Sequence, residues 1–196
     1  LASPLRLSSS GWKVQRSSAN QWQVKGTISI RNPHPRMEVF VPEIELKPTL
    51  LGRSDLSNVN VRCSLTPQHP DEEARSDGYW FAYIVKGRKT TQAEALITLE
   101  ASDGTELRQL LDTLWLEILW INYGPFGRLQ QRDGVLIPLR RPAPAQSSSS
   151  NWRQGDRCSV LPIRTHLLGT LDDPADVLRH YAGAVLQPGD VLPFPR

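Results

Sequence analysis

The strict alternation of apolar and polar residues from Gln21 to Arg31 constrains the fold more than any other feature of this 196-residue chain. Every even position in this stretch is apolar or glycine, namely Trp22, Val24, Gly26, Ile28 and Ile30. Residues two apart lie on the same face of a β-strand, so the pattern predicts a half-buried strand of an antiparallel sheet. Residues 17–20 read Ser-Ser-Ala-Asn and predict a hairpin turn from an upstream strand that carries Trp12 and Val14.

Further strand-like segments follow as far as residue 140. They cover residues 37–46, 59–65, 78–85, 93–100 and 135–139, and turn-forming residues separate them. Pro42 falls inside the first of these segments and predicts an edge strand or a bulge, because proline cannot donate a ladder hydrogen bond. Seven or eight short strands over about 130 residues predict a mainly β fold. We expect an immunoglobulin-like antiparallel β-sandwich at residues 11–140, after an N-terminal extension at residues 1–10.

Residues 106–123 fit two kinds of secondary structure. Leucine and isoleucine recur at helical spacing between Leu107 and Ile121, whereas residues 113–123 also fit a strand that is apolar on both faces. The aromatic residues Trp115 and Trp120 favour a strand for the second half. We therefore expect a short turn or helix at residues 106–111 that leads into a strand.

The composition changes after residue 140. Residues 141–156 contain a run rich in proline, alanine and serine and predict an exposed linker, which separates the sandwich from a fragment at residues 157–196. In this fragment a strand at residues 160–163 precedes a helix, with Asp173 as the expected N-cap and Pro174 as the first helical residue. We expect the buried face of the helix to consist of Val177, Leu178, Tyr181 and Ala182. Gly183 is expected to end the helix. A second strand at residues 191–192 completes the order β-α-β.

A fragment of this size cannot bury one face of its own helix. We therefore expect a protein partner or a further C-terminal domain to cover residues 157–196.

Three features of the fragment together resemble the N-terminal edge of the F420-0:γ-glutamyl ligase family. They are the run Leu161–Thr165, the pair Asp172–Asp173 that opens the helix, and the sequence Pro-Gly-Asp-Val-Leu at residues 188–192. The order of β domain, linker and edge looks like that of ligase-like proteins found in cyanobacteria. The resemblance implies a metal-dependent enzyme that uses GTP to add glutamate to a deazaflavin cofactor precursor. It also implies that the loop near the guanine nucleotide corresponds to Leu161, Pro162, Ile163 and Arg164.

A second, shorter resemblance lies in the sandwich. The sequence Ile-Arg-Asn-Pro at residues 30–33 follows a long alternating strand and is similar to water-stress and late-embryogenesis β-sandwich domains. This similarity implies a fold and no particular chemistry.

In the ligase family the carboxylates that hold the metal come later than the segment corresponding to residues 188–192. We therefore expect a non-catalytic β-sandwich accessory or interaction module that carries an incomplete ligase-like tail and requires no cofactor. The alternative is the N-terminal part of a GTP- and metal-dependent γ-glutamyl ligase-like enzyme whose catalytic region lies beyond this chain. GTP and a divalent metal would be required only in that case.

The charge distribution and hydropathy of the chain argue against a nucleic-acid partner and against a membrane span. The net charge is +3, and the densest basic cluster, Lys86, Arg88 and Lys89, indicates a solvated hairpin turn rather than a nucleic-acid surface. We expect no nucleic-acid partner. No apolar run reaches the roughly 18 residues of a membrane span. The chain begins at Leu1 and its only methionine is Met37, which leaves an upstream anchor possible and the localisation open.

No other residues form an evident catalytic or metal-binding set. His69 adjoins the acidic residues 71–73, for which a solvated acidic loop is the expected structure, and His34, His166 and His180 are expected to be exposed. Cys63 and Cys158 do not form a C-x-x-C motif, and the sequence leaves open whether they are free or paired. The strand tryptophans are expected in the core.

Overall fold

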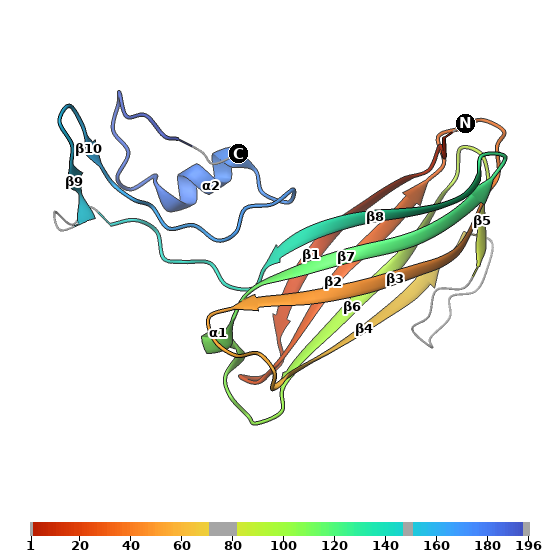
Figure 1. Ribbon diagram of the computed structural model, residues 1–196, viewed down its shortest axis with the longest axis horizontal. Coiled ribbons are helices and arrows are strands. Elements are labelled where there is room, and N and C mark those ends of the chain that lie inside the picture. The colour runs from red at the N-terminus through yellow and green to blue at the C-terminus, as the bar shows by residue number, and fades with distance from the viewer. Residues whose placement is uncertain (1, 71–81, 147–150, 194–196) are drawn as a thin grey trace.

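Two four-stranded antiparallel sheets form the main body of the chain (Figure 1). The computed structural model describes residues 2–70, 82–146 and 151–193. One sheet has the order β1-β2-β6-β4, and its strands are β1 (Arg6–Arg16), β2 (Gln21–Arg31), β6 (Thr90–Ala101) and β4 (Val59–Gln68). The other has the order β5-β3-β7-β8, with β5 (Tyr83–Val85), β3 (Val39–Gly52), β7 (Leu111–Gly124) and β8 (Gly127–Pro138). The predicted mainly β, immunoglobulin-like sandwich is confirmed.

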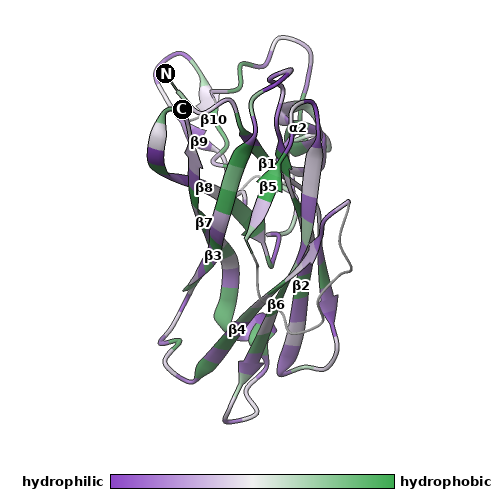
Figure 2. Ribbon diagram, turned by 90° about the vertical axis from the view of Figure 1, so that its right-hand side faces the viewer, coloured by the Kyte–Doolittle hydropathy of each residue, from purple (hydrophilic) through white to green (hydrophobic). Residues whose placement is uncertain are grey.

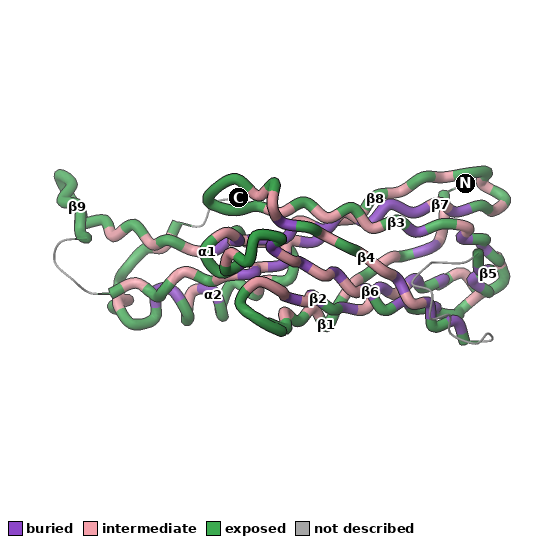
Figure 3. The backbone as a smooth tube through the Cα atoms, turned by 90° about the horizontal axis from the view of Figure 1, so that it is seen from below, coloured by how far each residue is buried: buried purple, intermediate pink, exposed green. Residues whose placement is uncertain are grey.

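The alternation that predicted the strands also builds the core. Figure 2 shows hydrophobic and hydrophilic residues alternating along the strands of the two layers, and Figure 3 shows buried positions recurring along them. On β2, Val24, Ile28 and Ile30 are fully buried between the sheets. Trp22 and Trp120 are also buried there, as predicted, whereas Trp12 and Trp115 are only half-buried. Burial of these apolar faces is the main stabilising contribution to the sandwich.

Three local predictions about the sandwich are confirmed. The short helix α1 (Leu107–Leu110) leads directly into β7. Residues 17–20 join β1 to β2, in which Val14 lies opposite Val24. Pro42 lies at a break in the register between β3 and β7, so it occupies a bulge; β3 is an inner strand, and the edge-strand alternative is wrong.

The first ten residues are not an extension outside the sandwich. Strand β1 begins at Arg6, and Leu7 pairs with Ile30 of β2. The serines at residues 8–10 conceal the alternation because they are polar on both faces of the strand. Residues 6–10 form a strand because they hydrogen-bond to the edge of β2. Their own sequence does not show this pairing.

The basic turn at residues 86–89 is not a hairpin. It joins β5 of one sheet to β6 of the other, so the two strands flanking it do not pair with each other. Of the strand predicted at residues 78–85, β5 forms the last three residues, and residues 78–81 lie outside the described residues.

The C-terminal segment, residues 151–193, lies at one end of the sandwich, and β5 lies at the other (Figure 1). It contains a two-strand hairpin of β9 (Arg153–Gln154) and β10 (Ser159–Val160), then α2 (Pro174–Tyr181). The strand predicted at residues 160–163 is thus limited to β10. No strand is present at residues 191–192, where Val191 is 88% exposed. Two apolar residues do not form a strand unless a neighbouring strand is there to pair with them, so the order β-α-β is wrong in its last element.

Candidate functional site

Helix α2 is the most regular part of the C-terminal segment, and local sequence explains where it begins. The side chain of Asp173 accepts hydrogen bonds from the backbone N–H of Ala175, at 2.9 Å, and of Asp176, at 3.1 Å. Asp173 is therefore the N-cap, as predicted, and Pro174 occupies the first turn. Val177 and Tyr181 form the buried face of the helix.

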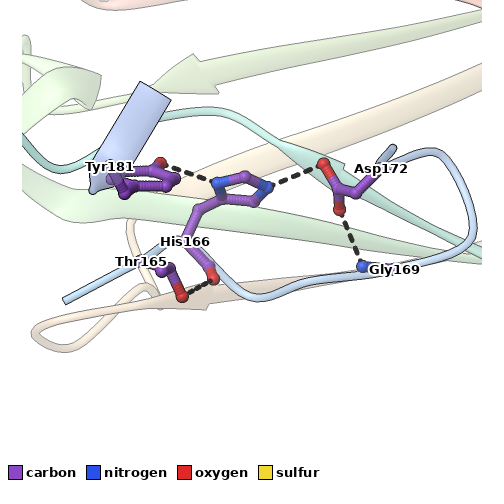
Figure 4. Close-up of polar contacts among 5 residues, drawn as sticks. All are labelled: Thr165, His166, Gly169, Asp172 and Tyr181. Atoms are coloured by element: carbon purple, nitrogen blue, oxygen red, sulfur yellow. Dashed lines mark hydrogen bonds and ion pairs between the residues drawn. The ribbon is translucent and has the colours of Figure 1, made fainter. Parts of the chain in front are cut away.

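A buried histidine ties α2 to the loop that precedes it (Figure 4). Nδ1 of His166 lies 2.7 Å from the hydroxyl of Tyr181, and Nε2 lies 2.9 Å from Oδ1 of Asp172. The second carboxylate oxygen of Asp172 accepts a hydrogen bond from the backbone N–H of Gly169. An ionised Asp172 requires Nε2 to carry the proton, which leaves Nδ1 to accept from Tyr181. Burial raises the pKa of Tyr181, so its hydroxyl keeps the proton that it donates.

This histidine network is the part of the site that sequence analysis missed. His166 was predicted to be exposed and is buried, whereas His180 is exposed, as predicted, and contacts the edge of Tyr181. The partners of His166 lie six and fifteen residues away along an irregular loop and a helix. No periodic pattern marks such a set, and the helical position of Tyr181 on the buried face was the only available signal.

The C-terminal segment also contacts the linker and the sandwich. The backbone N–H of Ala145 donates a hydrogen bond to the carbonyl of Tyr181 at 2.9 Å, and Gly169 lies against the side chain of Leu136 on β8. A small cavity of about 210 Å³ remains at this seam, between residues 164–167 on one side and the sandwich residues Leu51, Gly52, Asp112, Thr113 and Arg140 with the linker residue Pro142 on the other. Within the seam, Arg140 forms an ion pair with Asp112 at 2.8 Å. The predicted linker is thus followed by a segment that docks on the sandwich.

A wide groove of about 840 Å³ opens on the other side of the segment. Helix α2 lines it with Val177, Leu178 and Tyr181, the tail lines it with residues 189–193, and the hairpin with residues 158–160. Val160 and Val191 line this groove and are 51% and 88% exposed. Within the described lining the residues with polar side-chain groups are few: Trp152, Cys158, Ser159, Thr165, Tyr181 and Asp190. The groove therefore offers mainly apolar contacts.

The four residues predicted to lie near a nucleotide are divided between these two cavities. Leu161, Pro162 and Ile163 line the apolar groove, whereas Arg164 lines the small cavity at the seam. The loop thus presents its apolar residues, and no cation, to the groove. Among the described lining residues none is a lysine or an arginine.

Two other sets of candidate residues do not converge into a site. His69 is buried, stacked on Tyr83 with 3.9 Å between ring centroids, and its Nδ1 lies 2.6 Å from the hydroxyl of Thr91. The prediction of a solvated loop is therefore wrong for His69, and the acidic residues 71–73 lie outside the described residues. In the part of the chain that the structure describes, no group of three or more His, Cys, Asp or Glu side chains is arranged to hold a metal ion.

The two cysteines are free thiols. Burial raises the pKa of Cys63 to about 11, whereas Cys158 is exposed beside the groove. Among the described helices, none is long and apolar enough to cross a membrane.

Comparison with known proteins locates the similarity in the sandwich. The family model of the F420-0:gamma-glutamyl ligase, N-terminal Ig-like domain, matches residues 6–141. Among solved structures, the chain is similar to the GAE domain of GGA2p from Saccharomyces cerevisiae, with 9% identity and a TM-score of 0.37 over 70% of this chain and 93% of that one. It is likewise similar to the yeast GGA1 GAE domain, with 9% identity and a TM-score of 0.35 over 70% and 94%. No curated protein matches the chain.

The family match spans more than half of the chain, and its limits coincide with the first strand and the end of the sandwich. The match does not cover the C-terminal segment, which carried the sequence resemblance. The chain belongs to the family of the N-terminal Ig-like domain of F420-0:gamma-glutamyl ligase.

Proposed function

We propose that residues 6–141 are a non-catalytic accessory domain of a γ-glutamyl ligase-like protein, and that the C-terminal segment is the first part of its ligase domain. In this proposal the remainder of the ligase domain packs into the apolar groove. The sandwich at Leu136 and the linker at Ala145 hold the segment in place, so the sandwich supports the ligase domain without taking part in the chemistry.

The apolar groove is the observation that carries this proposal. Val160 and Val191 leave large apolar surfaces in water, beside a helix that has only one buried face. Covering such surfaces stabilises a protein by about 25 cal/mol for each Å² removed from water. Large apolar patches on soluble domains mark contacts with other protein segments, and the family of the sandwich makes a ligase domain the occupant that we propose.

The side chains of the groove do not fit GTP with a divalent metal. Leu161, Pro162 and Ile163 can pack against a flat base, but a triphosphate needs cations and a metal needs oxygen ligands. Within the described lining only Asp190 carries a carboxylate. We therefore assign no catalytic step to this chain, and we propose that GTP and metal binding require residues of the ligase domain.

Isothermal titration calorimetry of the chain with GTP and Mg²⁺ or Mn²⁺ tests the non-catalytic assignment. We expect no binding heat. A micromolar dissociation constant for GTP would contradict the proposal, because the chain would then hold a nucleotide site of its own.

Docking of the ligase domain needs a separate test, in which the chain is mixed with a separately expressed ligase domain of the same family. We expect a complex in analytical ultracentrifugation that is lost in the double variant Val160→Asp and Val191→Asp. Leu171→Asp is the matched control, because Leu171 is exposed and lies outside the groove. No complex, or equal loss in the control, would refute docking in the groove.

A further inference from the structure

Two loops meet at the end of the sandwich opposite the C-terminal segment and together form a basic tip, defined here as Arg36, Lys86, Arg88 and Lys89. The backbone N–H of Arg88 donates to the carbonyl of His34 at 3.0 Å. At Gly87 a side chain would lie 2.6 Å from the carbonyl oxygen of Pro35, so only glycine permits this close approach. All four basic residues of the tip are exposed.

The buried side chain of Asn32 fixes the base of the tip. Its amide donates hydrogen bonds to the carbonyl of Met37, at 2.7 Å, two residues before β3 begins, and to that of Val85, at 2.9 Å, the last residue of β5. Its carbonyl oxygen accepts from the backbone N–H of His34 at 3.1 Å. The charges of the tip are therefore held on a rigid base and not on two independent loops.

An apolar row adjoins the tip on the outer face of the β5-β3-β7-β8 sheet. Ile84, Phe40 and Tyr123 are neighbours in register across β5, β3 and β7, and they are 47%, 38% and 40% exposed. The rings of Phe40 and Tyr123 are 6.3 Å apart, and the exposed Arg128 is the next residue in register, on β8. The row thus runs from one basic group to another across the end of the sheet.

Charge and hydropathy together suit one kind of partner. Of the described residues, Arg36, Arg88, Lys89 and Arg128 form no ion pair, and Glu38 is an acidic residue beside the tip. Aromatic and aliphatic groups beside lysine and arginine match the interfacial region of a bilayer, where apolar side chains enter the headgroup layer and cations meet anionic lipids. A nucleic acid would need cations along the whole row, and the row is apolar between its ends.

We propose that the basic tip and the apolar row form a docking surface for a membrane that contains anionic lipids. Bound in this way, the sheet presents Ile84, Phe40 and Tyr123 to the headgroups, while the C-terminal segment at the opposite end points away from the bilayer. Attachment is peripheral and reversible, since it rests on a few side chains.

Flotation of the chain with vesicles tests this docking surface. We expect binding to vesicles of phosphatidylcholine mixed with phosphatidylglycerol, weak binding to vesicles of phosphatidylcholine alone, and release at high salt. Each lysine or arginine near an anionic membrane contributes about a fivefold gain in affinity. The triple variant Arg36→Gln, Arg88→Gln and Lys89→Gln should therefore bind about 100-fold more weakly.

Two further variants separate this surface from net charge. Lys13→Gln, Lys25→Gln and Arg108→Gln remove the same charge from exposed positions elsewhere and should leave binding unchanged. Phe40→Ser with Tyr123→Ser should weaken binding although the charge is kept. Thermal unfolding establishes that each variant is folded.

Three outcomes would overturn the proposal: no binding to the anionic vesicles, equal loss in the two charge variants, or full binding by the variant that lacks the aromatic rings. Binding of single-stranded RNA with the affinity found for vesicles would also refute it, in favour of a nucleic-acid surface.

Discussion

The hydroxyl of Tyr181 donates a hydrogen bond to Nδ1 of His166 over 2.7 Å, and this contact joins α2 to the loop that contains Leu161–Arg164. Replacing His166 with Ala leaves Tyr181 and Asp172 without their buried partner. The loss should cost about 1–3 kcal/mol. We expect hydrogen exchange to accelerate in residues 164–182 while the sandwich strands keep their protection.

The matched control for this variant is Arg179→Ala, because Arg179 is exposed on the same helix and its ion pair with Asp176 is exposed too. It should leave exchange unchanged. Equal acceleration in the two variants would mean that the His166 network does not hold the segment together.

Tyr181 also predicts how the C-terminal segment responds to alkali. Burial raises its pKa above the usual 10.0, so the folded segment holds the phenolic proton more tightly than the unfolded one. The resulting stability is complete below pH 10 and is lost as pH rises through the folded pKa. Tyrosine absorbance should show a late-titrating component that is reduced in Tyr181→Phe. Unchanged titration in that variant would exclude Tyr181 as its source.

The two thiols should differ in reactivity. Burial raises the pKa of Cys63 to about 11, and the thiolate is the reactive form, whereas Cys158 is exposed. Under mildly alkaline conditions iodoacetamide should modify Cys158 in the folded chain, and Cys63 only after unfolding. Peptide mass spectrometry distinguishes the two sites. Rapid modification of Cys63 in the folded chain would contradict its raised pKa and partial burial.

Local periodicity explains how much of the fold was predictable. The alternation around Val24 and the β-rich second half of residues 106–123 identify strands that the structure contains. The start of β1 was missed because its serines are polar on both faces of the strand and so show no alternation. This part of β1 is ordered by pairing with β2. The turn at residues 86–89 was misassigned because sequence does not show which sheet a strand joins.

The candidate site was less predictable than the fold. The N-cap Asp173 accepts hydrogen bonds from residues two and three positions away, so the local sequence was sufficient to predict it. His166, in contrast, depends on a loop that returns Asp172 to its ring and on a helix that brings in Tyr181. Arg164 was grouped with residues 161–163 by resemblance, yet the direction of the loop at this point places it on the seam.

Gly26 should tolerate no side chain while Trp12 is present. A Cβ at position 26 would overlap the ring of Trp12, which packs across the strand and whose indole N–H donates to Ser9 at 3.1 Å. Gly26→Ala should reduce the free energy of unfolding by about 1–3 kcal/mol. In a Trp12→Leu background the same change should cost less, because the smaller side chain leaves room. If Gly26→Ala lowered the free energy of unfolding equally in both backgrounds, a clash with Trp12 would not be the cause.

Asn32 should be among the most sensitive polar residues of the sandwich. Alanine at this position removes two amide donors from the buried carbonyls of Met37 and Val85, which should cost about 3 kcal/mol in urea unfolding. Asn32→Asp keeps the shape but cannot donate and buries a charge, so it should be at least as damaging. Asn60→Ala, at an exposed position of β4, is the control and should have little effect. A small effect of Asn32→Ala would show that other contacts hold the two loops together, and the basic tip would then owe its geometry to the backbone hydrogen bond between Arg88 and His34.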